Sequence, residues 1–410
     1  MKTVGIVAEY NPFHNGHKYH IEEAKRTTKA DFVVVIMSGN FVQRGTPAII
    51  DKYSRAKMAL SNGADLVFEL PIQYATATAE IFTHGAISLL QGLGFVDYVC
   101  FGGESTQLSQ MNELAQLFQN EPNNYKKALL ELQKEGLSFP TARTKAALQY
   151  FKERKNYDIF SFLLCNPNNI LGIGYLQALL RLHSSIEPII IKRTNSQYHS
   201  LSLSGSIASA TAIRKELLTN TTSHNIGNFI PKTVQNILFD SYQKTYPITE
   251  DDFSSLLYFS ITNPILNKSY PDISEDFMNK LKKHINFDSS FTELANSLKS
   301  KDIVYTRICR NLLHLMLNIS FPNKNESPSY LRLLGFKKTA SHLLNKEFLK
   351  ENGCNLPIIT KTANAKKLLS PQAFAMFSED IRASHLYYHI CYQKFGHSVK
   401  SEFQRGPIIL

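Results

Sequence analysis

The segment TVGIVAEYNPFHNGHKYHIEEAKRTT, residues 3–28, decides the fold of this chain. Its first residues are apolar and rich in β-branched side chains, which is typical of a buried strand. Its last part, HKYHIEEAKRTT (17–28), mixes polar and apolar residues at helical spacing. The tetrapeptide HNGH, residues 14–17, lies between the two. We therefore predict that HNGH occupies the turn from a first strand into a first helix, at the carboxyl edge of a sheet.

The same alternation of strand and helix continues through the first 105 residues. Strands alternating with helices of this length indicate βαβ units and a parallel sheet. The strand-like runs are almost wholly apolar, as expected when helices cover both faces. The sequence thus predicts an α/β fold, a Rossmann-like doubly wound parallel sheet. The further strands are predicted at 32–39, 66–70 and 98–103, and the helices at 52–63 and 79–94.

The rest of the chain changes character twice. Residues 106–160 are charged and helical, which indicates a helical insertion before a strand at 187–195 and a helix at 209–218. A polar break follows at Asn220–Ser223, and mostly helical periodicity runs from Pro231 to the end. We therefore expect two domains, one over 1–225 with the insertion inside it, and a mostly α-helical, basic one over 226–410.

Composition bounds the class of protein. The chain has 410 residues, 43% hydrophobic and 19% charged, which excludes a disordered chain and a coiled-coil rod. The apolar run FVVVIM (32–37) is far too short to span a bilayer, and the first residues read directly into a strand rather than a secretory signal. Five widely spaced cysteines without a CxxC pair argue against a disulfide framework and a structural zinc site. We expect a cytoplasmic protein.

Positive charge is concentrated at the carboxyl end. The chain has 45 Lys and Arg against 34 Asp and Glu, a net charge of +11, and residues 301–410 hold 16 basic against 7 acidic side chains. Aromatic residues lie among these bases, for example in HLYYHICYQKFGH (385–397). Such a region suits a polyanion such as RNA, although an ordinary solvated surface has the same composition.

The residues of HNGH are suited to phosphate chemistry. A helix start presents free backbone N–H groups and the positive end of the helix dipole, and Gly16 allows a ligand to approach the backbone. His14 and His17 are three residues apart, so both can donate hydrogen bonds to one phosphate group. The alternatives are two surface histidines in a turn, or a metal site from His14, His17 and His20. No carboxylate or cysteine stands at an offset that would complete such a site, so we expect none.

A second set of polar residues opens the helix after the last predicted strand. The string SATAIR (209–214) places Ser209, Thr211 and Arg214 there, following Ile207 and Ala208. Hydroxyls and N–H groups at a helix start suit phosphate, although a serine there is also an ordinary N-cap.

These motifs resemble a known superfamily. HNGH resembles the HIGH motif of the nucleotidyltransferases, which include class I aminoacyl-tRNA synthetases and small adenylyltransferases. SATAIR is similar to their ISSTxIR-like triphosphate motif, with Ala210 in place of the middle serine. Longer strings resemble the bacterial tRNA(Met) cytidine acetate ligase family, strongly over 1–220 and more weakly beyond. These strings are VAEYNPFHNGH, MSGNFVQRGTPAIIDKYSRAKMALSNGADLVFELP, CFGGE, SFPTAR, PNNILGIGY and IKRTNSQYH.

The resemblance implies that residues 1–225 form a nucleotidyltransferase-like, ATP-binding catalytic domain and that residues 226–410 bind tRNA. It also implies a two-step reaction. ATP activates acetate as acetyl-adenylate, and the acetyl group then passes to N4 of the wobble cytidine of elongator tRNA(Met). Mg²⁺ is expected to accompany ATP. The catalytic residues implied, which stabilise the departing pyrophosphate, are His14, His17, Ser209, Thr211 and Arg214. The ATP-binding residues implied are Val7, Ala8, Glu9, Tyr10, Asn11, Pro12, Phe13, His14, Asn15, Gly16, His17, Lys18, Tyr19, His20, Gly102, Asn168 and Arg193.

Several other residues are weaker candidates. Gln43, Arg44 and Gly45 follow the second strand, where Arg44 could hold acetate or the tRNA backbone. Asn169 competes with Asn168 for the same role, and we favour Asn168. The remaining weaker candidates are Lys52 for phosphate, Asp51 and Glu104 as structural acids or Mg²⁺ ligands through water, Arg143 for ATP or tRNA, Lys192 as a surface charge, and Lys337, Lys338, Lys366 and Lys367 for tRNA.

Two other functions share parts of this pattern. A small-molecule adenylyltransferase has HNGH and a Ser/Thr-Arg helix start, but it needs no RNA-sized basic region. A non-catalytic RNA-binding protein on the same fold has no reason to keep His14, Gly16, His17 and Arg214 together. The acetate ligase accounts for both the motifs and the charge.

Overall fold

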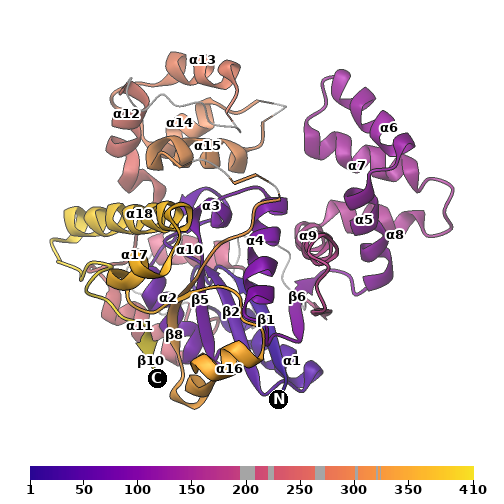
Figure 1. Cartoon of the computed structure of the whole chain (residues 1–410). Helices are drawn as coiled ribbons and strands as arrows, with labels where there is room; N and C mark the ends of the chain where they lie inside the picture. Colours follow the sequence, from indigo (N-terminus) through magenta and orange to yellow (C-terminus); the bar gives the residue numbers. More distant parts are fainter. Residues whose placement is uncertain (194–207, 220–225, 264–272, 301–302, 320–321, 324) are drawn as a thin grey trace.

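The computed structural model describes residues 1–193, 208–219, 226–263, 273–300, 303–319, 322–323 and 325–410 (Figure 1). Four features expected from the sequence lie outside these ranges. They are Ile207, the polar break at Asn220–Ser223, residues 194–199 of IKRTNSQYH, and the domain boundary at 225.

A sheet of eight strands forms the centre of the molecule, with the strand order β10-β8-β5-β2-β1-β6-β7 and with β9 paired to β8. The five strands expected from the first half of the chain are all present and mutually parallel, which confirms the α/β prediction. They are β1 (Thr3–Ala8), β2 (Phe32–Ser38), β5 (Leu66–Leu70), β6 (Tyr98–Gly103) and β7 (Glu187–Lys192).

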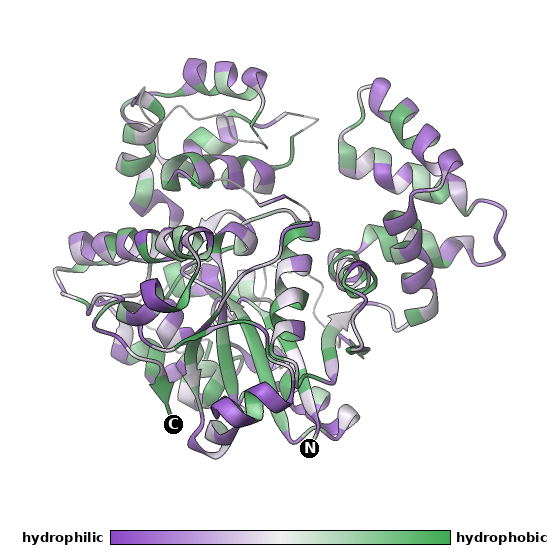
Figure 2. Ribbon diagram, in the orientation of Figure 1, coloured by the Kyte–Doolittle hydropathy of each residue, from purple (hydrophilic) through white to green (hydrophobic). Residues whose placement is uncertain are grey.

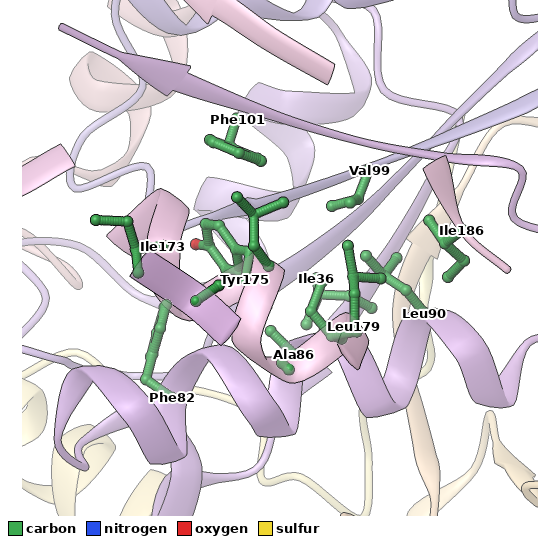
Figure 3. Packing of buried hydrophobic residues seen from close by; sticks show 14 of the residues in the cluster. Ile36, Phe82, Ala86, Leu90, Val99, Phe101, Ile173, Tyr175, Leu179 and Ile186 are labelled. Atoms are coloured by element: carbon green, nitrogen blue, oxygen red, sulfur yellow. The ribbon is translucent and has the colours of Figure 1, made fainter. Parts of the chain in front are cut away.

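Helices cover both faces of this sheet. Alternate residues of β2 enter two different cores, Val34 and Ile36 on one face and Val33 and Val35 on the other. Figure 3 shows the first core, where Ile36 lies near Leu90 and Leu179. Both faces of the strand are therefore dry, which is why its sequence is apolar without alternation. The covering helices are α1 (Asn15–Thr28), α2 (Lys52–Leu60), α4 (Ala79–Gly92), α9 (Pro167–Arg181) and α10 (Ala210–Thr219).

The helical insertion is confirmed and precedes α9. Figure 1 shows its helices on the right of the sheet, and Figure 2 shows that they are polar on their outer sides. They are α5 (Leu108–Asn120), α6 (Asn123–Lys134), α7 (Phe139–Tyr150) and α8 (Tyr157–Cys165). Within the described ranges no single helix is long and apolar enough to cross a membrane. The pair α8 and α9 reaches that length and apolar content together but bends by 100°.

The carboxyl-terminal half contains helices, as expected, but it also contributes three strands to the sheet. β8 (Leu331–Phe336) pairs antiparallel with β5, while β9 (Ile358–Ile359) and β10 (Ile408–Ile409) run parallel to β8. These strands were not predicted from the sequence. The six-residue segment LRLLGF, which is apolar except for Arg332, has no periodicity that separates a strand from a buried helix, and only its pairing with β5 decides.

Three helices of the carboxyl-terminal half share a separate core above the sheet (Figure 1). They are α12 (Ser254–Thr262), α14 (Phe291–Ser297) and α15 (Tyr305–Leu317). The remaining elements are β3 (Phe41–Val42), β4 (Thr46–Pro47), α3 (Ile72–Ala75), α11 (Lys232–Ser241), η2 (Glu250–Phe253), α13 (Glu275–His284), η4 (Lys338–Leu344), α16 (Lys346–Glu351), η5 (Thr362–Asn364), α17 (Ala365–Leu368) and α18 (Pro371–Phe395).

A buried ionic network fastens the end of the chain to the first half. Lys52 is fully buried, and its ammonium group donates to both carboxylate oxygens of Glu69 at 2.9 and 2.8 Å and lies 3.2 Å from Glu402. Burial alone would lower the pKa of Lys52, but Glu402 and Glu69 outweigh it and raise that pKa. Arg332 of β8 also pairs with Glu402, at 3.5 Å. Lys52 is therefore a structural cation, and the expectation that it contacts phosphate is wrong.

Candidate active site

A cavity of about 270 Å³ opens at the carboxyl edge of β1, β6 and β7, where the sequence placed the site. Its walls come from the end of β1, the start of α1, the residues after β3, and the starts of α9 and α10. Of the expected residues, it is lined by Val7, Ala8, Glu9, Tyr10, His14, Gly16, His17, Tyr19, His20, Gly102, Asn168, Arg193, Ser209, Thr211 and Arg214.

The two histidines of HNGH hold each other in one orientation at the start of α1. The Nδ1 atom of His14 accepts a hydrogen bond from the Gly16 N–H at 3.1 Å, and the Nδ1 atom of His17 accepts one from the His14 N–H at 3.3 Å. Their rings are stacked, with centroids 3.7 Å apart. Because both Nδ1 atoms accept, a neutral ring must carry its proton on Nε2. Each imidazole is thus fixed as an Nε2–H donor.

The surroundings keep these rings neutral. Burial, together with the positive charges of Arg193 and Arg214, lowers the pKa of His14 to about 3. Burial and the neighbouring His14 hold the pKa of His17 well below its usual range. His20, next along the helix face, has a pKa lowered to about 4 by burial and by Arg193. The site therefore presents neutral hydrogen-bond donors from α1 and permanent positive charge from the arginines opposite.

The start of α10 faces HNGH across the cavity. Arg214 donates to the carbonyl of Asn11 at 2.8 Å and to the Thr211 hydroxyl at 3.2 Å, which joins the two predicted motifs directly. The Ser209 hydroxyl accepts from the Ala212 N–H at 3.1 Å and so caps the helix. Ser209 therefore fills the ordinary N-cap role and also lines the cavity.

Gly102 and the two asparagines lie on the opposite wall. A Cβ on Gly102 would come within 3.3 Å of the Arg193 side chain, so glycine lets Arg193 lie across the strand end. Asn168 lines the cavity and donates to Glu104. Asn169 is buried and accepts from the N–H groups of Glu104 and Ser105, at 2.9 and 3.2 Å. The preference for Asn168 as the ligand-facing residue agrees with this placement, while Asn169 and Glu104 fix the loop after β6.

Five residues of the expected ATP-binding loop do not line the cavity. Their side chains serve the loop itself or the surface. Asn11 accepts from the Ile49 N–H at 2.8 Å, Phe13 is buried against Tyr10 and His17, and Asn15 donates to the Asn228 carbonyl at 2.8 Å. Pro12 is buried beside them, and Lys18 lies 3.8 Å from Glu22 at the surface.

The weaker candidates also divide into residues that line the cavity and residues that do not. Gln43, Arg44 and Lys192 line the cavity. Asp51 caps α2 by accepting from the N–H groups of Tyr53 and Ser54. Arg143 lies elsewhere, in a second cavity, with its guanidinium 3.8 Å from the centre of the Phe118 ring. These placements make Asp51 a structural acid and put Arg143 outside the cavity at HNGH.

The apolar wall of the cavity was missed by sequence reasoning. It is made by Phe82 of α4, Phe101 of β6 and Tyr175 of α9, which lie close together in Figure 3, and by Leu171 and Ile191. Tyr175 lies within the quoted string PNNILGIGY, but nothing local separates it from core residues at helical spacing. Only the meeting of three elements turns these side chains toward a cavity.

Comparison with known proteins agrees with this geometry. Residues 1–402 match the family model of the HIGH nucleotidyl transferases. The chain is 39% identical over the full length of both proteins to a tRNA(Met) cytidine acetate ligase of Acetivibrio thermocellus. It is 42% identical to one of Thermoanaerobacter sp. (strain X514), over 94% of this chain and 95% of that protein.

Solved structures give the same result. The crystal structure of Thermotoga maritima TmcAL in its apo form superposes with a TM-score of 0.93 at 30% identity, covering both chains fully. The form of that protein bound with alpha-thio ATP gives 0.89 at 29% identity, again over both full chains. The fold and the site thus define a nucleotidyltransferase of the HIGH class. Within that class, the chain belongs to the tRNA(Met) cytidine acetate ligase family.

Proposed function

We propose that this chain is an ATP-dependent ligase that activates acetate as acetyl-adenylate and acetylates N4 of the wobble cytidine of elongator tRNA(Met). The observation that carries the chemistry is the pair of neutral Nε2–H donors of His14 and His17 facing Arg214 across one cavity. The identities of the acceptor and of the acyl group are inferred from the names of the relatives reported above. We place the reaction in the cytoplasm, where tRNA and ATP meet.

The first step is an in-line displacement at phosphorus. A carboxylate oxygen of acetate bonds to the α-phosphorus of ATP, and the bond to the bridging oxygen of pyrophosphate breaks. His14 and His17 donate to the phosphate oxygens as their charge rises, while Arg193 and Arg214 neutralise the departing pyrophosphate. Ser209, Thr211 and the N–H groups at the start of α10 add further donors. Fixed dipoles and charges do this work without a covalent intermediate on the protein.

The second step transfers the acetyl group to an amine. Cytidine N4 is conjugated to its ring and is a weak nucleophile, so a mixed anhydride is a suitable donor. The apolar wall of Phe82, Phe101 and Tyr175 limits the access of water to that anhydride. The wobble base lies in a single-stranded loop, from which it can be turned out into a pocket.

Mg²⁺ was expected to accompany ATP. Among the described residues no group of three His, Cys, Asp or Glu side chains is placed to hold a metal ion. Mg²⁺ commonly binds through substrate phosphates and one or two carboxylates, and Glu9 is the one carboxylate among the described residues that line the cavity. The part of the chain that the structure describes thus forms no all-protein coordination sphere for the ion. We propose that Mg²⁺ would be held by the ATP phosphates, where it would neutralise charge.

The direct test is ATP–pyrophosphate exchange with purified protein, acetate and labelled pyrophosphate, with and without tRNA. We expect exchange that requires acetate, followed by a gain of one acetyl group on tRNA(Met) in mass spectrometry. Formation of a stable dinucleotide instead would favour the small-molecule adenylyltransferase. Absence of ATP binding would favour the non-catalytic RNA-binding protein.

The structure narrows the surface proposed for tRNA. Lys337 pairs with Asp65 at 3.3 Å, at the amino edge of β5, which is the edge of the parallel strands opposite the cavity. Helix α15 instead lies on the cavity side. It packs so closely against Gly45, the residue after the cavity-lining Arg44, that a Cβ on Gly45 would collide with the Arg310 backbone. We therefore propose that the bases of α15, rather than Lys337, contact tRNA near the site.

Charge reversal distinguishes these two places. Arg307→Glu on α15 is expected to weaken tRNA binding about tenfold at low salt and to reduce its salt dependence, since phosphate contacts release counterions. Lys337→Glu is the matched control and should change affinity less than twofold. Filter binding at several salt concentrations measures both, and equal effects of the two variants would contradict the proposal.

A further inference from the structure

Glu9 stands out among the described residues that line the cavity because it is their one acid. Its neighbours in the lining include four cations, Arg44, Lys192, Arg193 and Arg214. Such a set attracts anions, and both substrates of the first step, ATP and acetate, are anions. A carboxylate in the same cavity repels each of them. Neither anion therefore accounts for its presence, and in the activation step Glu9 could act only through Mg²⁺ held on the ATP phosphates.

The Glu9 carboxylate is held in place by backbone rather than by another charge. Glu9 is the first residue after β1, and its backbone carbonyl accepts a hydrogen bond from the Arg55 guanidinium at 2.7 Å. Its Oε1 atom accepts a hydrogen bond from the Gln43 N–H at 3.0 Å. An N–H donor orients a carboxylate and leaves it further acceptor capacity. Among the described residues, no Lys, Arg or His forms an ion pair with Glu9 within 4.0 Å.

A phenol lies near this carboxylate. Burial raises the pKa of Tyr175, and the negative charge of Glu9 raises it further. Tyr175 therefore stays protonated and belongs to the apolar wall. The cavity thus has two chemically distinct sides. The histidines and arginines form a side for phosphates, and Glu9 is an acceptor beside the wall that borders the acyl donor.

The one reactant that gains from a carboxylate is the amine of the second step. The cytosine N4 amino group is a hydrogen-bond donor, for which Glu and Asp are the complementary acceptors. We propose that Glu9 receives the cytidine N4 amino group and takes its proton during acetyl transfer. This assignment rests on the proposed ligase function and extends it to a catalytic base.

Acetyl transfer forms one bond and breaks one bond at the acetyl carbonyl carbon. The N4 lone pair bonds to the acetyl carbonyl carbon, the bond from that carbon to the adenylate oxygen breaks, and AMP leaves with that electron pair. One N4 proton passes to the Glu9 carboxylate and then to water. A carboxylate is basic enough, because N4 becomes strongly acidic once it bonds to the carbonyl carbon and carries positive charge.

The two half-reactions of the full-length protein separate this role from others. In Glu9→Gln, single-turnover transfer from preformed acetyl-adenylate to tRNA should slow about 100-fold, the effect typical of a lost general base. Acetate-dependent ATP–pyrophosphate exchange should continue, with the KM for acetate lowered about threefold, because one repelling charge is gone. Glu9→Asp should recover part of the transfer rate. Glu22→Gln, at an exposed position of α1, is the matched control.

Loss of exchange in Glu9→Gln together with a changed Mg²⁺ dependence would overturn the assignment, since the carboxylate would then act in activation. Transfer within threefold of wild type would also overturn it. Absence of acetate-dependent exchange in the wild-type protein would instead reject the proposed ligase function, and this assignment with it.

Discussion

His17→Ala is expected to lower the rate of acetate-dependent ATP–pyrophosphate exchange by about 100- to 1,000-fold, the loss typical of one fixed donor to a developing anion. The alanine variant also leaves the His14 N–H without its acceptor at 3.3 Å, so the orientation of the HNGH turn is loosened as well. ATP affinity should fall much less, because the arginines across the cavity remain. The measurement is exchange over a range of ATP concentrations, which separates kcat from KM.

Two substitutions at the same position test which ring nitrogen acts. The amide nitrogen of glutamine reaches the position of Nε2, whereas that of asparagine reaches the position of Nδ1. We therefore expect His17→Gln to retain more activity than His17→Asn. The pKa of His17 lies well below its usual range, so the wild-type rate should not decline as pH rises from 6 to 8. A decline through pH 6.5 would show that the imidazolium is the active form. His397→Ala, at an exposed site, is the control.

Lys52→Met is expected to destabilise the folded chain by about 3–5 kcal/mol, because it leaves two buried carboxylates without their shared cation. Glu69 and Glu402 are 4% and 0% exposed, and water cannot replace the ammonium group between them. The loss should also release the end of the chain, since Glu402 ties it to α2 and to Arg332 of β8. Urea unfolding and limited proteolysis after residue 395 measure the two effects.

Two further variants make this result specific, one at an exposed lysine outside the network and one within the network. Lys57→Met lies on the exposed side of the same helix and should change stability by less than about 0.5 kcal/mol. Lys52→Met combined with Glu69→Gln should recover part of the loss, because Glu69 is the carboxylate that Lys52→Met leaves without a cation, whereas Glu402 still pairs with Arg332. A loss below 1 kcal/mol in Lys52→Met would show that the ammonium group is not essential to the network.

The position of the two motifs could be predicted because its physical reasons are local. A strand followed shortly by HNGH at the start of a helix must present that turn at the carboxyl edge of a parallel sheet. SATAIR opens α10 in the same way, and Arg214 then reaches the Asn11 carbonyl. The prediction for Lys52 failed for the opposite reason. Its position one residue after Asp51 gives no sign of Glu402, which lies 350 residues further along the chain.

The sequence was sufficient to predict the α/β class, the five parallel strands, the helical insertion and the position of the two motifs, because each depends on periodicity or on a short contiguous segment. The tertiary structure was needed to show that β8 and β10 extend the sheet, that Lys52 is structural, and that Tyr175 and Glu9 line the same cavity as the motifs. The reason is physical. Burial, the pairing of strand edges and the neutralisation of charge depend on which distant segments meet, and no local pattern records those meetings.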